Sequence, residues 1–307
     1  MMNTARIEAV QKDALEYVGK RPVRMGYDAL SVTKERGMRL DRSTWTQVRD
    51  YFRENDTVLI GVGSTECHGR HNPLGTDTMA PDRILELFDA REGGFLIAPT
   101  LPYGATDDLV GYPGTISLGV DGLYRVVSAI TGQLYDYGAR RFVFVNGHGG
   151  NVKSLSTACV DLNERGCLAA LVNWWLVAPQ INPAWRGGHG GAMETSANLA
   201  SDPSSVDMSQ VMDEELLPDV GEDLPSVAWS TVRYDGVNVD MPRHIARFAT
   251  SGWLSHGMDD HPAKASAELG RAMLEGTADW LVGFVRTLAR EELPEPFDRA
   301  HATEHLD

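Results

Sequence analysis

The sequence predicts an α/β fold in which helices flank a mainly parallel sheet. Short apolar runs such as Thr57 to Val62 alternate along the chain with longer segments of helical character. A continuous apolar run is typical of a strand that is buried on both faces, as strands of parallel sheets are. Strands that alternate with helices in this way indicate βαβ units.

The expected elements follow one another along a single domain of residues 1–307. The expected strands are 57–62, 95–98, 141–145 and 168–175. Three helices are expected at residues 3–19, 122–137 and 152–164, and a closing helix at about 263–290. A short helix is expected from a cap at Ser43-Thr44 to about Glu54, and another from Pro81 through Phe88. We expect a helical N-terminal extension over about residues 1–54 and long loops or short strands over residues 201–250. About residues 292–307 are expected to form a polar tail.

Composition excludes several classes of protein. The net charge is −15, which argues against a nucleic-acid partner or an anionic membrane, because binding a polyanion needs a basic surface. The three cysteines, Cys67, Cys159 and Cys167, have no paired spacing, which suits a reducing compartment. With no apolar signal segment and no run of about 20 apolar residues, the expectation is a soluble cytoplasmic protein.

A first polar cluster follows the strand expected at residues 57–62. It contains Glu66, His68, His71 and Asp77 within the segment GSTECHGRHNPLGTDT. Ligands of open α/β sheets bind beyond the carboxyl ends of the strands, so the position favours a site over an incidental surface loop. Two carboxylates and an imidazole are ligands that suit Zn²⁺ or Mn²⁺.

Two glycine-rich segments add further candidates. NGHGGN, residues 146–151, follows the strand expected at 141–145 and presents His148, although it also fits a turn with Asn151 as the cap of the next helix. GGHGGAMETS, residues 187–196, contains His189 and Glu194. His189 is a natural proton carrier beside a metal-bound water, while Glu194 fits both a ligand and an acid favoured by the start of a helix.

Together these motifs resemble the creatininase (creatinine amidohydrolase) family. That family carries a Glu-x-His-Gly-x-His-x-Pro-x-x-x-Asp segment, an Asn-Gly-His-Gly-Gly-Asn turn and a later histidine loop that ends in Glu-Thr-Ser, and all three occur here in order. The segment Gly111 to Ser117 resembles the family's Pro-Gly-Thr segment. The resemblance spans roughly residues 57–200 and implies a three-layer, creatininase-like sandwich.

Carried over by residue, the resemblance implies a centre of two divalent ions, Zn²⁺ and/or Mn²⁺. Its ligands would be Glu66, His68, Asp77 and His148, with Asp77 bridging. His189 matches the histidine assigned to proton transfer, and Glu194 matches a carboxylate beside the metals.

One position departs from creatininase itself, which has a ligand glutamate two residues after the histidine of the turn. This chain has Gly150 there, so Glu194 is expected to supply the missing carboxylate, and creatinine becomes a doubtful substrate. Candidate substrate contacts are His71 and the pair Trp174 and Trp175, which end an expected strand near the site. Core packing of the two tryptophans is an equal alternative.

The activity implied is hydrolysis, in which metal-bound hydroxide attacks a carbonyl of a small polar ring and opens a cyclic amide C–N bond. The alternative is ring C–C hydrolysis of an oxidised inositol, as in relatives that hydrolyse 3-dehydro-scyllo-inosose. The family also implies a homo-oligomer, commonly a hexamer. A dinucleotide-binding protein fits less well, because Glu66 stands where the third fingerprint glycine should be, and a non-catalytic module fits poorly with so complete a ligand set.

Overall fold

The computed structural model describes residues 37–298 apart from residues 216, 229, 244–250 and 255–257. The chain divides into two units, Met1–Lys34 and Glu35–Asp307, and every described residue belongs to the second. The helix expected at residues 3–19 therefore lies outside the described residues, as does most of the expected N-terminal extension. The interpretation of the whole chain as one domain stays a prediction.

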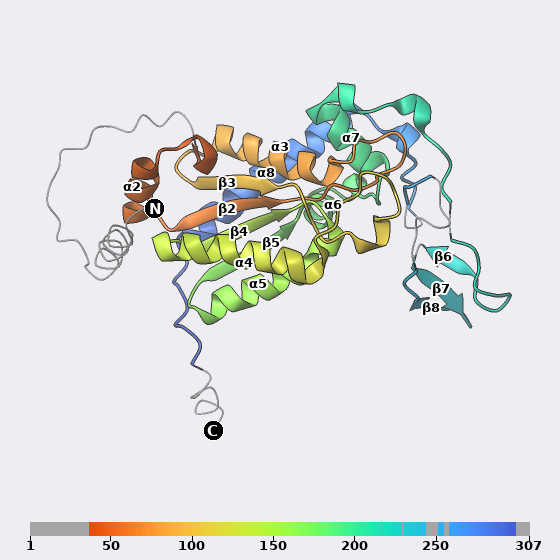
Figure 1. Ribbon diagram of the computed structural model, residues 1–307. Coiled ribbons are helices and arrows are strands. Elements are labelled where there is room, and N and C mark those ends of the chain that lie inside the picture. The colour runs from red at the N-terminus through yellow and green to blue at the C-terminus, as the bar shows by residue number, and fades with distance from the viewer. Residues whose placement is uncertain (1–36, 216, 229, 244–250, 255–257, 299–307) are drawn as a thin grey trace, which may run out of the picture. The chain divides into compact units, whose positions relative to one another are not determined.

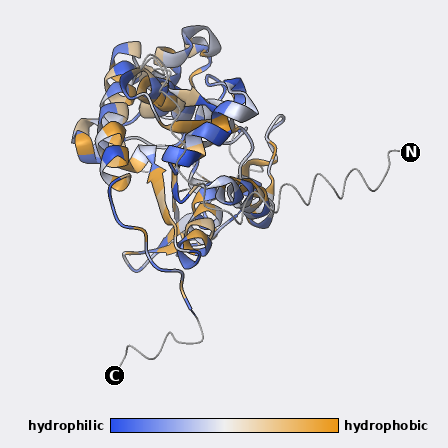
Figure 2. Ribbon diagram, turned by 90° about the vertical axis from the view of Figure 1, so that its left-hand side faces the viewer, coloured by the Kyte–Doolittle hydropathy of each residue, from blue (hydrophilic) through white to orange (hydrophobic). Residues whose placement is uncertain are grey.

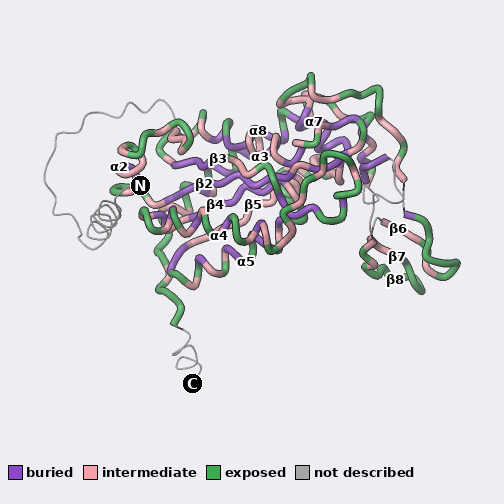
Figure 3. The backbone as a smooth tube through the Cα atoms, viewed as in Figure 1, coloured by how far each residue is buried: buried purple, intermediate pink, exposed green. Residues whose placement is uncertain are grey.

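A five-stranded parallel sheet forms the centre of the second unit (Figure 1). Its strands, in spatial order, are β1 (Met38–Arg39), β3 (Leu96–Leu101), β2 (Thr57–Val62), β4 (Arg141–Asn146) and β5 (Leu168–Asn173). All six residues of β2 are buried, which agrees with its central position and its uninterrupted apolar sequence. Figure 3 shows the same burial along the middle of the sheet.

Alternate residues of the strands point to opposite faces, and each face has its own core. Leu59 and Val143 belong to one core, whereas Val58 and Phe142 belong to the other. The first core is covered by α3 (Thr76–Arg91), α6 (Trp174–Ile181), α7 (Ala192–Ser201) and α8 (Ala267–Leu288). The second is covered by α2 (Trp45–Glu54), α4 (Gly119–Tyr137) and α5 (Val152–Glu164). The expected three-layer α/β sandwich is confirmed.

The helices carry apolar and polar residues in alternation along their turns, as Figure 2 shows. In α4 the buried residues Leu123, Val127 and Leu134 lie at helical spacing and face the sheet. No helix among the described residues is long and apolar enough to cross a membrane. Beyond α7, the chain forms a small antiparallel sheet of β6 (Ser226–Ala228), β7 (Thr231–Tyr234) and β8 (Val237–Asp240) within the region expected to contain short strands.

Several expected boundaries were wrong: the strand expected at 95–98 spans Leu96–Leu101, and the helix expected at 122–137 begins at Gly119. The helix expected to open at Pro81 begins at Thr76, and Pro81 lies inside it. Pro81 has no N–H to donate to the carbonyl of Asp77, so the helix tolerates it at the loss of a single bond near its start. The strand expected to run to Trp175 ends at Asn173, and α6 begins at Trp174.

Candidate metal centre

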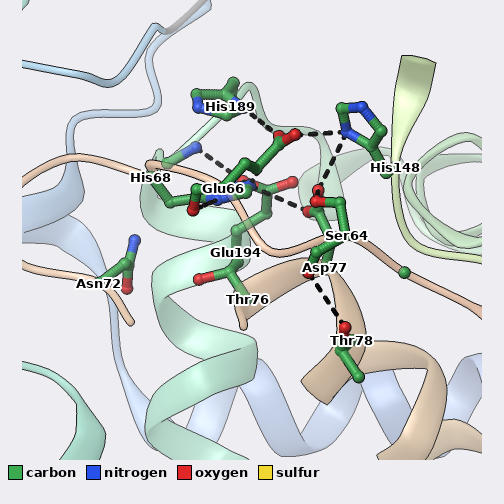
Figure 4. Close-up of polar contacts among 12 residues, drawn as sticks. Ser64, Glu66, His68, Asn72, Thr76, Asp77, Thr78, His148, His189 and Glu194 are labelled. Atoms are coloured by element: carbon green, nitrogen blue, oxygen red, sulfur yellow. Dashed lines mark hydrogen bonds and ion pairs between the residues drawn. The ribbon is translucent and has the colours of Figure 1, made fainter. Parts of the chain in front are cut away.

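Six predicted residues meet at the carboxyl edge of the sheet, as Figure 4 shows. The loop after β2 carries Glu66 and His68, and the turn after β4 carries His148. Asp77 lies in the first turn of α3, and Glu194 lies in the first turn of α7, just after the loop that contains His189. Five segments of the chain therefore direct side chains to one point.

Asp77 lies between two histidines. Its Oδ1 is 2.9 Å from Nε2 of His68, and its Oδ2 is 3.0 Å from Nδ1 of His148. Each oxygen of this carboxylate faces a different imidazole. The hydroxyl of Ser64 donates to Oδ2 over 2.8 Å, which fixes the orientation of the carboxylate.

Glu66 and Glu194 complete the cluster. Oε1 of Glu66 lies 3.1 Å from Nδ1 of His148, 3.7 Å from Nδ1 of His189 and 3.8 Å from Nε2 of His68. Oε2 of Glu194 lies 3.5 Å from Nε2 of His68. Ligands of a tetrahedral ion at about 2.1 Å lie about 3.4 Å apart, so these separations match one coordination sphere or two that share atoms.

Three groups of three residues could hold a cation. They are Glu66 with Asp77 and His148; His68 with Asp77 and Glu194; and Glu66 with His68 and His189. The first two groups share Asp77, whose two oxygens face different histidines. The third group includes His189, whose ring stacks on that of His68 with centroids 4.1 Å apart.

Backbone carbonyls fix the tautomers of the three histidines. In each ring, the remote nitrogen is the one that faces away from the cluster. In His148 it lies 2.9 Å from the carbonyl oxygen of Ala105. The corresponding distances are 3.2 Å to Glu66 in His68 and 2.7 Å to Cys67 in His189. A carbonyl oxygen can only accept, so each remote nitrogen donates, and in the neutral ring the other nitrogen presents a lone pair. Such support of the remote nitrogen is usual for histidines that bind metals.

The electrostatics of the cluster favour positive charge. Burial opposes the charge on His68, yet the carboxylates of Asp77, Glu194 and Glu66 together raise its pKa to about 10. Burial likewise opposes the charge on His148, and Glu66 and Asp77 raise its pKa well above the usual value. Burial raises the pKa of Glu194 to about 8. Three carboxylates in a buried space thus attract a proton or a metal cation.

Several buried polar atoms are suited to a cation. Both carboxylate oxygens of Glu66 and Nε2 of His68 are buried and make no hydrogen bond within the described part of the chain. Buried polar atoms are normally satisfied, and the printed neighbours of Oε1 of Glu66 and Nε2 of His68 are other ligand-type atoms of the cluster. Their carboxylate and imidazole chemistry fits Zn²⁺ or Mn²⁺.

A cavity of about 550 Å³ opens over the cluster. Its lining includes five residues of the cluster, Glu66, Asp77, His148, His189 and Glu194. The remaining lining residues are Ala105, Thr106, Asp107, Asp108, Leu109, Val120, Gly147, Gly149, Gly150, Trp175, Leu176, Gly187, Gly188 and Met258. This volume is in the range of cavities that bind small molecules.

Two of the three predicted substrate contacts do not reach this cavity. Trp174 is 1% exposed and packs in the core between the sheet and α8, while its neighbour Trp175 lines the cavity. Adjacent helical residues face directions about 100° apart, which separates the two rings. His71 is also buried, and its Nε2 lies 3.0 Å from the carbonyl of Gly190 and 3.1 Å from Oγ1 of Thr195. His71 therefore supports the site from behind.

The thiol of Cys67 belongs to none of the three candidate ligand groups. It is buried, and its Sγ lies 3.8 Å from the carbonyl of Gly252. Burial raises the pKa of this thiol, so it stays protonated and unreactive.

Sequence reasoning missed the residues that support the cluster. Ser64 holds Asp77, and Asn151 does not cap α5 with its side chain but joins three loops instead. Asp260, near the end of the chain, accepts hydrogen bonds from the loop that contains His189. Ser64 and Asn151 are near recognised motifs, whereas nothing in the sequence around Asp260 links it to the site.

Comparison with known proteins places this geometry in context. A family described as creatinine amidohydrolase (creatininase) matches residues 41–285. The chain is 37% identical over 154 residues to the mycofactocin precursor peptide peptidase of Mycolicibacterium smegmatis. The matched stretch covers 48% of this chain and 59% of that protein. The chain thus spans less than two thirds of the length of that peptidase.

Two further relatives carry other names. The chain is 31% identical over 193 residues to the creatinine amidohydrolase of Pseudomonas putida, with 55% of this chain and 74% of that protein covered. It is 25% identical over 190 residues to the 3-dehydro-scyllo-inosose hydrolase of Thermotoga maritima, with 58% and 61% covered. A solved structure of creatininase with manganese superposes with a TM-score of 0.64 and 26% identity, over 83% of this chain and all of that one. The chain belongs to the creatininase family.

Proposed function

We propose that this chain is a divalent-metal-dependent hydrolase that opens the C–N bond of a small polar cyclic amide. The observation that carries the proposal is the position of Asp77, whose two oxygens lie 2.9 and 3.0 Å from ring nitrogens of His68 and His148. A carboxylate shared in this way suits two cations better than one. Hydrolysis itself is the activity that the names of all three relatives have in common.

Each cation would have its own ligands besides Asp77. Glu66 and His148 would hold one ion, and His68 and Glu194 would hold the other. Two bound divalent ions supply an activated water at neutral pH and polarise the carbonyl that it attacks. The protein supplies the fixed orientation of the ligands, the burial that excludes bulk water, and the groups that move protons.

His189 is the proposed proton carrier. Its Nε2 donates to the carbonyl of Cys67, so Nδ1 is the atom that can take a proton from the cavity side. Burial and the neighbouring His68 hold the pKa of His189 well below its usual value, so the ring is neutral and presents a lone pair at Nδ1. A proton received at Nδ1 would pass to the leaving nitrogen of the amide.

Gly150 argues against creatinine itself as the substrate. A Cβ at this position would lie 2.0 Å from the carbonyl oxygen of Ala105 and 2.5 Å from Nε2 of His148. The turn therefore has no room for the glutamate that creatininase carries there. Glu194, whose Oε2 lies 3.5 Å from Nε2 of His68, would supply the carboxylate in its place.

The charges around the cavity favour a neutral or cationic substrate. Asp107 and Asp108 line it outside the cluster, whose own charge the two cations would offset, and neither Lys nor Arg is among the described residues of its lining. A substrate carboxylate would find no basic partner of the kind that usually binds one. A cyclic amide or ureide without a carboxylate fits these walls.

Peptide hydrolysis is the second candidate. It is favoured by the 37% identity to a peptide peptidase, which exceeds the 31% identity to creatinine amidohydrolase. The names of both relatives denote cleavage of an amide C–N bond, whereas the relative that acts on an inosose is 25% identical. We therefore rank ring C–C hydrolysis third. Assembly into a homohexamer and a cytoplasmic location remain predictions from the family resemblance and the sequence.

A substrate panel tests the proposal. The chain, loaded with Zn²⁺ or with Mn²⁺, would be incubated with lactams, cyclic ureides, short peptides and dehydro-inositols, and products would be identified by the mass of one added water. The expected result is ring opening of a lactam or ureide, absent from an Asp77→Asn control. Turnover of peptides alone, or of dehydro-inositols alone, would contradict the cyclic-amide assignment.

A further inference from the structure

The loop that presents His189 has no strand beneath it. Residues 187–191 lie between α6 and α7, and they contain glycines on both sides of the histidine. A glycine-rich loop is costly to order, because glycine loses more conformational freedom than other residues. His189 and Glu194 nevertheless have to be held to within a fraction of an ångström for the chemistry proposed above.

The buried carboxylate of Asp260 holds this loop from a segment about 70 residues further along the chain. Oδ2 of Asp260 accepts the N–H of Gly188 over 2.7 Å, and Oδ1 accepts the N–H of Met193 over 3.1 Å. The backbone carbonyl of Asp260 accepts the N–H of Ala192 over 3.0 Å. Three donors are thus satisfied, one beside His189 and two in the first turn of α7.

Asp260 takes the place of the missing cap of α7. The residue at the cap position is Gly191, which has no side chain to accept from the first turn. Glu194 reaches back to the N–H of Gly190 over 2.6 Å, while its Oε2 also faces His68. Because Asp260 accepts from the other donors of the helix start, the carboxylate of Glu194 can stay directed at the cluster.

The glycines of the loop match this carboxylate. A Cβ at Gly191 would lie 1.9 Å from Oδ2 of Asp260, and a Cβ at Gly187 would lie 2.7 Å from it. The glycines therefore permit close approach of Asp260, which is a role different from the mobility that their number suggests. Asp260 is 4% exposed, and although burial raises its pKa to about 6, it remains ionised at neutral pH.

We propose that Asp260 is a positioning residue of the active site, whose carboxylate fixes His189 and Glu194 in register with the metal cluster. This inference depends on the proposed function, since it assigns Glu194 to one of two cations. Asp260 is not among the residues that line the cavity or form the three candidate ligand groups. It acts through the backbone of the loop and of the first turn of α7.

Asp260→Asn is the test variant. It keeps the shape of the side chain but replaces one acceptor oxygen with an NH₂ group, which then opposes an N–H of Gly188 or of Met193. Asp259→Asn is the matched control. It removes the same charge one residue away, but Asp259 is exposed and pairs with Lys264 rather than with the loop. Both full-length variants and the unaltered chain would be stripped of metal and titrated with Mn²⁺.

The unaltered chain and the Asp259→Asn control should bind two equivalents of Mn²⁺. In Asp260→Asn, the affinity for one equivalent should fall about 10- to 100-fold while the other is unchanged, which is the usual effect of losing a group that supports a ligand. With the best amide of the panel, kcat should fall by a similar factor and KM should change less than about two-fold. Thermal unfolding of the same samples measures any general loss of stability.

The titration distinguishes an error in the proposed function from an error in the role given to Asp260. If the unaltered chain bound fewer than two equivalents, the proposed function would be wrong. If it bound two and Asp260→Asn bound both as tightly with unchanged kcat, the role given to Asp260 would be wrong. Equal weakening of both equivalents together with a lower melting temperature would also overturn it, because that result describes general destabilisation.

Discussion

Two glycine-rich segments each bring a histidine to the site, and they are held by different means. The turn of residues 146–151 continues directly from β4, and its Gly147 N–H donates to the carbonyl of Val62 over 2.8 Å, as a further rung of the sheet. The loop of residues 187–191 has no strand and depends on Asp260 and on Leu254, whose N–H donates to the carbonyl of His189 over 2.7 Å.

The first turn contains its own anchors. Asn146 donates to the carbonyl of His148 over 2.8 Å, and Asn151 donates to Asn146 over 3.1 Å and to the carbonyl of Gly63 over 3.0 Å. Both asparagines are fully buried. A motif that includes its own supports can be recognised in the sequence, whereas a loop whose support lies about 70 residues further along the chain cannot.

The largest effects on activity are expected from replacing His148 or His189, and the two substitutions should differ in their effect on metal content. His148→Ala should remove both activity and one equivalent of bound metal, because its Nδ1 faces Glu66 and Asp77. The loss of activity should exceed the roughly 10- to 100-fold typical of losing a supporting group. His189→Ala should retain two equivalents of metal and lose about 10²- to 10⁴-fold in kcat, as the removal of a proton carrier does.

Elemental analysis and steady-state kinetics of these two variants check the prediction. If His189→Ala lost an equivalent of metal, the residue would be a ligand in the group that it forms with Glu66 and His68. If it kept full activity, its assignment to proton transfer would be wrong.

A smaller effect is expected from the anchor of the first turn. Asn151→Ala removes the acceptor for the N–H of Ala105 and the donor for the carbonyl of Gly63, and leaves both groups buried. Each unsatisfied group costs about 1–3 kcal/mol, so a chemical denaturation curve should show a clear loss of stability. Asn151→Ala should lower the affinity for the cation held by His148, whereas Asp260→Asn should lower the affinity for the cation held by Glu194. Weakening of the same equivalent by both variants would remove the distinction between the two anchors.

Local patterns predicted much of this structure. The strand at residues 57–62 and the helix at residues 152–164 have the expected bounds, because a buried apolar run and a glycine-bounded amphipathic segment carry strong local signals. The cluster of Glu66, His68, Asp77 and His148 was also within reach, since parallel strands bring their carboxyl ends to one edge.

Tertiary contacts decided the rest. Trp174 and Trp175 are chemically the same, and only the start of α6 sends one ring into the core and the other to the cavity. His71 fits a family motif as well as His68 does, yet its ring packs against Gly190 and Thr195 behind the site. Such outcomes depend on how distant segments pack, which a local sequence pattern does not specify.

Anomalous diffraction from crystals of the chain grown with Mn²⁺ or Zn²⁺ tests the central claim most directly. Two peaks per chain are expected on either side of Asp77, one beside Glu66 and His148 and the other beside His68 and Glu194. A chain that showed no peak within this cluster, or bound its metal elsewhere, would contradict it.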